Sequence, residues 1–574
     1  MAKHNPAIHS CSRSTNPGPD TSYPNVVRHG GKTIYSIRLT KTNLMLKAAT
    51  IVLLLLLLLL ACKNAQRGND TKASRPVNTA HLKNTPLPVD ASLLEEAPKT
   101  VQAFYAANGN TTLWTEKADR LALQEAIEDI ATDGLMPSDY NIAFLKKFEA
   151  LTAISEEECM RYDILMTQSF AKLVSHLFKG KLKPSGVYYD WALSPKKIDV
   201  NTLLTEALKN HNIKEIADRC RPRHAIYGSL RESLAYLNNL PDDKDIPKIK
   251  ITKPVTRNDS TSTVSIIKQR LAYWGDLDIA NSAGNIYDKE TAKAVKKFQE
   301  RHGIVADGSV NSRTADALNF SRNARREQVV ANLERWRWFP YDFGEKAIVV
   351  NIPNYRLAVL ENNKDTVATY NVVVGKADRR SPVLHSVLSN LVLNPTWTVP
   401  PTYLKKDLTP AAIKDTAHFA HLNMKIYRGD KEIPVAEWDS LKPDHYVYVQ
   451  SPGNHNSLGQ IKFNFRNGFS VYLHDTNHRE YFKKPYRALS SGCVRVQDPL
   501  KLAGYVLDKE DAGWTKEKLD ELLATSDTQS LSLKKTTHVH QLYWTAWMDK
   551  GGLQFRNDIY SLDKILYDKL RSQR

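Results

Sequence analysis

Apolar positions between residues 92 and 240 recur at intervals of three and four, the spacing of one face of an α-helix. The pattern is clearest at residues 127–131 and 164–177, and Gly/Pro segments at 133–137 and 179–184 interrupt it. We therefore predict a helical domain over residues 92–240. No group of residues in it has a catalytic pattern, so the expected role of this domain is a scaffold.

A second, smaller helical unit is predicted beyond a linker. Residues 241–263 contain three prolines and end in a Ser/Thr-rich run, which is typical of a linker. From residue 264 to 320, apolar residues mark three short helices, with a turn at Asp307-Gly308. Residues 321–344 then predict a connecting helix.

The pattern changes to strands after residue 345. Strands are predicted at residues 347–351, 356–360, 366–374, 391–393, 461–465 and 469–473. The partly periodic segment 400–452 interrupts them, which favours a capping insertion within a domain over residues 345–525. A C-terminal segment, 526–574, is expected to pack on the scaffold and on this domain. The predicted fold class is multidomain α+β: helical scaffold, three-helix module and mostly β domain.

The N-terminus predicts export. Residues 48–61 form an apolar run with eight consecutive leucines, too short for a transmembrane helix of about 20 residues. The run fits the core of a signal peptide, flanked by Lys41 and Lys47. It ends at Cys62, and residues 59–62 resemble a bacterial lipobox, which implies lipidation of Cys62 within a segment 1–62. Met45 is a plausible true start, and residues 63–91 are expected to be a flexible tether.

Charge and cysteine content limit the partners. A formal net charge of +18 favours an anionic partner, but basic residues form no stripe interleaved with aromatics, so nucleic acid is not expected. The exported body contains Cys159, Cys220 and Cys493. A Cys159–Cys220 disulfide is allowed by export and supported by no pattern. We find no cluster with metal-ligand spacing and expect no cofactor.

A cysteine and a histidine are the strongest candidates for chemistry. Cys493 lies in a Ser-Ser-Gly-Cys turn, and His474 follows the last predicted strand before it. A thiol with a pKa of about 8.5 is mostly protonated at neutral pH. A neighbouring imidazole can accept its proton, leaving a thiolate–imidazolium pair. Spacing alone does not single out this pair, because His455 and His478 would serve equally well as bases.

Two neighbours of the cysteine extend this hypothesis. Gly492 has no side chain, so a carbonyl can approach the backbone there, where N–H groups would bind an oxyanion. Arg495 lies two residues beyond Cys493 and would project to the same side of an extended segment. A guanidinium there can hold a substrate carboxylate.

These segments resemble a known family. Residues 472–476 and 488–496 look like the signature of L,D-transpeptidases, the YkuD-like catalytic domain, and more narrowly the large, scaffold-containing YcbB-like type. Further matching segments are residues 394–401, 452–453, 456–459 and 545–547. Residues 264–320 resemble the peptidoglycan-binding type 1 module, on residues 269–271, 287–288, 291, 294–299 and 307–308.

The resemblance implies roles by position. Cys493 would be the nucleophile, His474 the general base, and the backbones of Tyr472 and Gly492 candidates for the oxyanion site. Arg495 would anchor substrate. Where the general family has a second histidine, this chain has Ser491, as the YcbB-like branch does. Asp475 and Ser491 are candidates for substrate contacts and for a polar partner of His474.

The implied activity is formation of 3→3 cross-links in peptidoglycan through a cysteine thioester, with release of terminal D-alanine. The expected partners are stem peptides and glycan, and the membrane through an N-terminal lipid. A monomer in the periplasm of a bacterial envelope is expected. Three alternatives stay open: a carboxypeptidase or amidase, a protein-to-peptidoglycan ligase, and a non-catalytic wall-tethering lipoprotein. Whether the module binds glycan or only spaces the domains also stays open.

Overall fold

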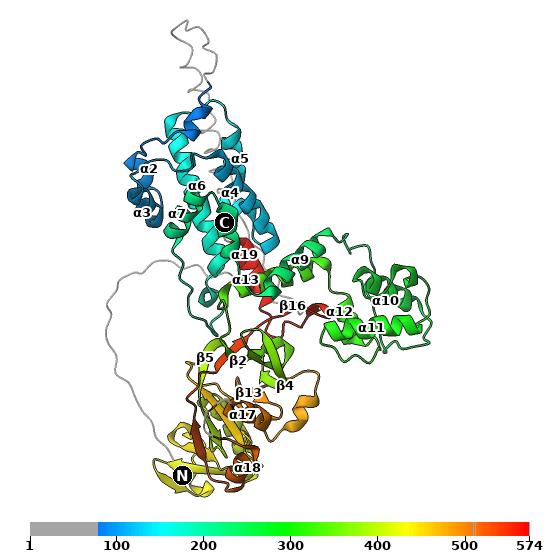
Figure 1. Ribbon diagram of the computed structural model, residues 1–574. Coiled ribbons are helices and arrows are strands. Elements are labelled where there is room, and N and C mark those ends of the chain that lie inside the picture. Colours follow the sequence, from blue (N-terminus) through cyan, green and yellow to red (C-terminus); the bar gives the residue numbers. More distant parts are fainter. Residues whose placement is uncertain (1–77, 509, 511–512, 573–574) are drawn as a thin grey trace, which may run out of the picture. The chain divides into compact units, whose positions relative to one another are not determined.

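The structure, a computed structural model, describes residues 78–508, 510 and 513–572 (Figure 1). The predicted signal segment with Cys62, the alternative start at Met45 and most of the predicted tether lie outside these residues. Among the described helices, none combines the length and the apolar content that a membrane span requires.

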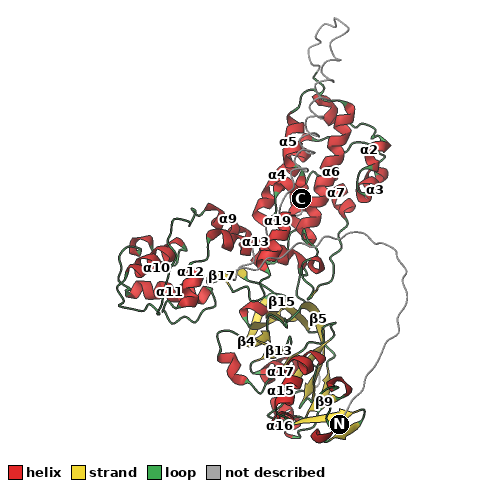
Figure 2. Cartoon of the chain, turned by 180° about the vertical axis from the view of Figure 1, so that it is seen from behind, coloured by secondary structure: helices red, strands yellow, loops and turns green. Residues whose placement is uncertain are grey.

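Helices dominate the chain up to residue 338 and strands dominate from residue 346 (Figure 2). The first helical domain has one buried central helix, α6 (Glu156–Lys179), which begins at a capping box formed by Ser155 and Glu158. Its inward face buries Phe170, Leu173 and Leu177 completely. The other helices around it are α2 (Ala91–Glu95), α3 (Lys99–Ala107), α4 (Lys117–Asp129), α5 (Ile142–Ala150), α7 (Val200–Asn210) and α8 (Ile213–Arg219). The last helix of the domain, α9 (Ala225–Asn239), instead buries Tyr227, Leu230 and Leu234 in the core that it shares with the connecting helix and the β domain.

Residues 78–91 are not part of a tether, contrary to the predicted boundary. The Lys83 ammonium donates hydrogen bonds to the carbonyls of Phe148, Glu149 and Leu151, at 2.7, 2.9 and 2.8 Å. These carbonyls lie at the C-terminal end of α5, where a cation is favourable. The segment is therefore bound to the helical domain, and composition alone does not reveal this contact.

The three-helix module consists of α10 (Ser262–Tyr273), α11 (Lys289–Arg301) and α12 (Ser312–Leu318). Asp288 and Asn311 cap α11 and α12 by accepting backbone N–H bonds. The second half of the predicted linker packs on this module, because Val255 pairs with Val310 and Arg270 donates to the Pro247 carbonyl at 2.9 Å.

The connecting helix, α13 (Arg322–Trp338), is buried along most of its length. Its two innermost arginines are paired: Arg335 with Asp563 at 2.5 Å and Arg337 with Glu334 at 2.6 Å. Trp336 stacks on Trp544, with ring centroids 4.6 Å apart.

The eleven-stranded main sheet closes on itself, because β15 pairs with both β2 and β5. Its order is β1-β5-β10-β11-β13-β4-β3-β2-β15, with β12 beside β4 and β14 beside β5. The strands are β1 (Trp191–Ala192), β2 (Lys346–Asn351), β3 (Arg356–Glu361), β4 (Asp365–Gly375), β5 (Val383–Leu393), β10 (Ile461–Phe465), β11 (Leu473–His474), β12 (Ala488–Ser490), β13 (Val494–Val496), β14 (Gln529–Ser532) and β15 (His538–Leu542). Helices α17 (Pro499–Asp508) and α18 (Lys516–Ala524) follow β13.

Two predictions about this domain need correction. The predicted strand at 469–473 is only β11, because the Asn467 side chain accepts the N–H groups of Phe469 and Val471 and so replaces strand pairing. The C-terminal segment does not merely pack on the body: β14 and β15 are strands of the main sheet. The described elements that follow the sheet are the hairpin β16 (Ala546–Asp549) and β17 (Gly552–Phe555) and helix α19 (Asp563–Ser572).

The insertion at 400–452 has its own small core, which includes Leu408, Phe419, Ile426 and Tyr448. It forms most of a four-stranded sheet in the order β6-β9-β7-β8. The elements are β6 (Trp397–Thr398), β7 (Met424–Arg428), β8 (Lys431–Ile433), β9 (Val447–Gln450), α14 (Pro401–Tyr403), α15 (Thr409–Lys414) and α16 (Ala417–His421).

Candidate active site

Strand register brings the predicted nucleophile and base to one face of the sheet. β11 and β13 are parallel, and His474 is the register partner of Arg495. Successive side chains in a strand point to opposite faces. Leu473 and Val494 are fully buried on the inner face, so His474, Arg495 and Cys493 share the other.

The turn that carries Cys493 is fixed by hydrogen bonds at three positions. The Ser490 hydroxyl donates to the Cys493 carbonyl at 2.6 Å and accepts the Gly492 N–H at 3.2 Å. The buried Ser381 hydroxyl donates to the Gly492 carbonyl at 2.8 Å. Gly492 has φ +116°, a backbone conformation that side chains rarely adopt. The cysteine is thus held on a rigid turn.

Tyr472 contacts the sulfur with two donors. Both its backbone N–H and its hydroxyl hydrogen-bond to the Cys493 thiol. The Trp397 indole in turn donates to the Tyr472 hydroxyl. Burial raises the pKa of the Cys493 thiol, while Tyr472, Lys462 and Arg495 act in the opposite direction. Because burial dominates, the resting thiol is protonated at neutral pH.

His474 is neutral in the resting site. Its side chain is buried, and this burial together with the charge of Arg495 lowers its pKa to about 3. The Asp475 carbonyl favours the protonated ring. However, Nδ1 has no hydrogen-bond partner among the described residues. The predicted thiolate–imidazolium pair is therefore not the resting state: a neutral thiol and a neutral imidazole line the same cavity, and a neutral imidazole is the form that can accept a proton.

Arg495 is a half-buried cation without a carboxylate partner among the described residues. Its Nη1 donates to the Thr476 hydroxyl at 3.3 Å, and its Nε has no acceptor in the described part of the chain. No described Asp or Glu forms an ion pair with it. Burial lowers its pKa. An unpaired guanidinium in such surroundings is suited to bind an anionic group of a ligand.

These side chains surround one cavity of about 150 Å³. The insertion and the strand before it contribute Trp397, Pro400, Tyr403 and Leu422 to its wall. The remaining lining residues are Ser457, Leu458, Tyr472, His474, Asn477, His478, Ser490, Ser491, Cys493 and Arg495. The insertion thus forms one side of the cavity that contains the thiol.

The other predicted site residues lie as follows. Asp475 is buried, but its carboxylate accepts the Gln460 N–H at 2.9 Å and pairs with Arg479 at 3.0 Å, so it orients neither His474 nor a ligand in this cavity. Ser491 is exposed and lines the cavity. The Gly492 N–H is already used by Ser490, which removes it as an oxyanion donor in this state. The Cys493 N–H has no acceptor among the described residues.

Two further residues contact the site and were not identified from the sequence. Lys462 on β10 is the register partner of His474, and its ammonium lies 4.1 Å from the centre of the Tyr472 ring. Its signal in the sequence is the alternation of β10, in which a lysine separates two apolar residues. Ser381 lies more than 100 residues from Cys493, and no local pattern connects them.

The alternative bases His478 and His455, and the other cysteines Cys159 and Cys220, lie in surroundings different from those of His474 and Cys493. His478 lines the cavity but pairs with Glu480 at 3.1 Å, and His455 is not among the lining residues. Cys159 and Cys220 are buried and free, so the allowed disulfide is absent. Burial raises the pKa of Cys220 to about 11.

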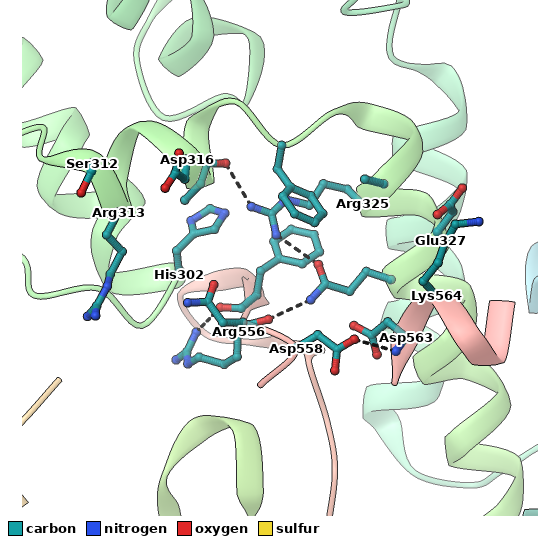
Figure 3. Close-up of a pocket in the computed structure, with 16 residues that line it drawn as sticks. His302, Ser312, Arg313, Asp316, Arg325, Glu327, Arg556, Asp558, Asp563 and Lys564 are labelled. Atoms are coloured by element: carbon teal, nitrogen blue, oxygen red, sulfur yellow. Dashed lines mark hydrogen bonds between the residues drawn. The ribbon is translucent and has the colours of Figure 1, made fainter. Parts of the chain in front are cut away.

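A larger cavity of about 740 Å³ lies elsewhere, between the three-helix module, α13 and residues 555–564 (Figure 3). The guanidinium of Arg325, which lines this cavity, packs on the rings of Phe320 and Phe555, with its Cζ 4.5 and 4.2 Å from their centres. Asp563 is already paired with Arg335 and accepts the Thr545 hydroxyl. No cysteine lines this cavity, so it offers no counterpart to the centre at Cys493.

Comparison with known proteins identifies three parts of the chain. Residues 99–234 match the family model described as "Scaffold domain", residues 260–318 match "Putative peptidoglycan binding domain", and residues 345–517 match "L,D-transpeptidase catalytic domain". The chain therefore contains these three domains, which confirms the predicted resemblance and the multidomain α+β fold class.

One curated relative, the "Putative L,D-transpeptidase" of Haemophilus influenzae, is 35% identical over 241 residues, which are 42% of this chain. The chain spans about half the length of this relative, 48%. Solved L,D-transpeptidase structures from Xylanimonas cellulosilytica and Stackebrandtia nassauensis are 15% and 17% identical, each covering 51% of this chain and 99% and 98% of their own chains. Their TM-scores to this chain are 0.17 and 0.19.

Proposed function

We propose that this chain, which contains an L,D-transpeptidase catalytic domain, forms 3→3 cross-links between peptidoglycan stem peptides through a thioester on Cys493. The observation that carries the proposal is the shared face of β11 and β13. There a thiol, a neutral imidazole and an unpaired guanidinium line one cavity inside the matched catalytic domain.

In the first half-reaction, the Cys493 sulfur attacks the carbonyl carbon of the third residue of a tetrapeptide stem. His474 accepts the thiol proton as the C–S bond forms, and then gives it to the nitrogen of the departing D-alanine as the C–N bond breaks. The product is a thioester with the stem tripeptide. Because the pKa of His474 is lowered, the imidazole does not take the thiol proton in the resting site. The proton is therefore transferred to His474 while the sulfur attacks the carbonyl carbon.

In the second half-reaction, the side-chain amine of another stem attacks the thioester carbonyl. His474 accepts a proton from that amine, the C–S bond breaks, and the sulfur leaves and recovers its proton. The new amide joins two third residues, which is the 3→3 link. Water in place of the amine would give a tripeptide and make the protein a carboxypeptidase; a lysine of an envelope protein would make it a ligase.

The oxyanion formed in each half-reaction needs donors close to the sulfur. The Cys493 N–H, which has no acceptor among the described residues, is the donor best placed in the chain. The Tyr472 hydroxyl and N–H hydrogen-bond to the sulfur in the resting site. They can donate to the carbonyl oxygen instead when negative charge develops there. Lys462 adds a positive charge on the same face.

Arg495 would hold the free carboxylate of the diamino acid at the third stem position. This residue type carries both the carboxylate and the amine that the reaction requires. Since Arg495 has no ion-pair partner among the described residues, a substrate carboxylate would be its first counter-charge. Ser491 and the insertion at 400–452 would contact the rest of the stem.

The matched domains favour the cell envelope as location and peptidoglycan as partner. We further propose that Cys62 carries a lipid that holds the protein at the periplasmic face of a membrane, where it acts as a monomer. The module at 264–320 would bind the wall glycan. These parts of the proposal rest on sequence and resemblance.

The proposal is tested by incubating the full chain with purified disaccharide-tetrapeptide and analysing the products by mass spectrometry. A dimer that lacks one D-alanine supports transpeptidation. Tripeptide monomer alone would instead show a carboxypeptidase, and unchanged substrate would favour a tethering role. The matched control, Cys493→Ala, must yield neither dimer nor tripeptide.

A further inference from the structure

Outside the active site, three histidines converge on one face of the main sheet. β5 and β15 are antiparallel, and His540 is the register partner of His385. His538 lies two residues before His540, so its side chain points to the same face. One ring nitrogen from each of the three lies within 4.8 Å of the others.

The three rings lie close together. His385 Nε2 lies 3.1 Å from His538 Nδ1, and the rings of His385 and His540 stack at 4.5 Å with an interplanar angle of 12°. Two nitrogens bound to one tetrahedral zinc ion, with Zn–N of about 2.0–2.1 Å, are separated by about 3.3 Å. The spacing of His385 and His538 is close to that value.

His540 is oriented as a metal ligand is. Its side chain is only 1% exposed, and its Nε2 donates to the Phe343 carbonyl at 2.9 Å. That bond places the proton on Nε2 and leaves Nδ1 with a lone pair. Nδ1 is buried and has no hydrogen-bond partner among the described residues. A backbone carbonyl that accepts one ring N–H commonly fixes the tautomer of a histidine whose other nitrogen binds a metal.

We propose that His385, His538 and His540 form a zinc-binding site, with water as the fourth ligand. His540 binds through Nδ1, and His385 and His538 through the nitrogens that now share a hydrogen bond. The proton of that hydrogen bond moves to the other nitrogen of its own ring, so all three ligands stay neutral. His385 is exposed, which gives the ion a path from solvent.

The ligand set decides the class of ion. Three imidazoles with no thiolate suit Zn²⁺, Cu²⁺ or Ni²⁺ better than Mg²⁺ or Ca²⁺, which prefer oxygen ligands. Among the first group, a tetrahedral site with an open position fits Zn²⁺. Because the ligands come from β5 and β15, the ion would clamp the strand pair that closes the main sheet. The sequence alone did not predict this site. His538 and His540 form a His-x-His pair, and the third ligand, His385, comes close to them only when β5 and β15 pair.

The test uses the full chain in a Cys493→Ala background, so that the active-site thiol cannot bind metal. Metal-free protein is titrated with Zn²⁺, passed through gel filtration and analysed for zinc per chain. We expect one equivalent retained, a rise in Tm on zinc addition, and tetrahedral absorption bands when Co²⁺ replaces Zn²⁺. His385→Gln, at an exposed site, and His538→Gln, at a half-buried one, should each weaken binding at least tenfold and abolish the Tm shift.

The matched control is His81→Gln, which removes an exposed histidine of the helical domain and should bind zinc as the parent does. Two outcomes overturn the proposal: no retained zinc in the parent protein, or equal retention and Tm shift in His385→Gln. Neither outcome depends on transpeptidase activity, so the failure of this proposal and that of the proposed function are separate.

Discussion

His474 on β11 lies opposite Arg495 on β13, and burial together with the guanidinium charge lowers the pKa of the imidazole to about 3. The same guanidinium opposes the rise in the pKa of the Cys493 thiol. One cation therefore acts on both partners of the proton transfer, and it has no carboxylate of its own among the described residues.

The role of Arg495 is tested by Arg495→Met. A hydrogen bond to a charged group contributes about 1.5–3 kcal/mol, so kcat/KM should fall about 10- to 100-fold. The control Arg466→Met changes an exposed arginine and should leave kcat/KM unchanged. Kinetics are measured with the tetrapeptide and with its analogue whose third-residue carboxylate is amidated. If Arg495 binds that carboxylate, the parent enzyme has a lower kcat/KM for the amidated analogue than for the tetrapeptide, whereas Arg495→Met has nearly the same kcat/KM for both. An equal decrease in kcat/KM on amidation in both enzymes would refute this contact.

The pKa of Cys493 predicts a pH profile. Because burial raises the thiol pKa, alkylation by iodoacetamide should be slow at neutral pH and should increase to a plateau above the ordinary pKa of about 8.5. Lys462→Met removes a charge that favours the thiolate and should shift the profile to still higher pH. The exposed Lys431→Met is the control. A plateau already reached near pH 6 would show a resting thiolate and contradict the neutral pair.

Ser381 is predicted to act through the turn. Its hydroxyl donates to the Gly492 carbonyl and accepts the Gly375 N–H at 2.9 Å, so Ser381→Ala leaves two buried backbone groups unpaired. The expected cost is about 1–3 kcal/mol of unfolding free energy. The acylation rate should fall further than the alkylation rate, because only acylation needs the turn in place. Denaturant unfolding and both rates are compared with Ser389→Ala, which changes an exposed hydroxyl; a drop in stability with unchanged acylation would make Ser381 purely structural.

Buried histidines predict acid sensitivity. Burial lowers the pKa of His176, His474 and His540, each to about 3, from an ordinary value near 6.5. Between these values the unfolded chain binds more protons than the folded chain, so stability is present above pH 6.5 and is lost as pH falls. Each histidine contributes up to about 1.4 kcal/mol per pH unit. Tm measured from pH 7 to pH 4 should fall steeply, and a flat profile would contradict the buried neutral rings.

The sequence predicted what depends on local pattern. The helical periodicity of residues 164–177 corresponds to α6, and three residues predicted from the motifs, His474, Cys493 and Arg495, line one cavity. It did not predict what depends on pairing between distant segments. The contact of Lys462 with Tyr472, the bond from Ser381 to Gly492 and the closure of the sheet by β15 all need the register of strands that are far apart in the chain. The same holds for Asp475, whose carboxylate contacts the Gln460 N–H and Arg479, partners that are recognisable only in the folded chain.

The central claim is that Cys493 forms a thioester with the stem tripeptide. The most direct measurement is rapid acid quenching of the full chain with tetrapeptide donor and no acceptor, followed by intact-mass and peptide mass spectrometry. The account predicts an adduct of the stem tripeptide on the peptide that contains Cys493, cleaved by hydroxylamine and absent from Cys493→Ala. Turnover of the tetrapeptide by Cys493→Ala, or an adduct on any other residue, would contradict it.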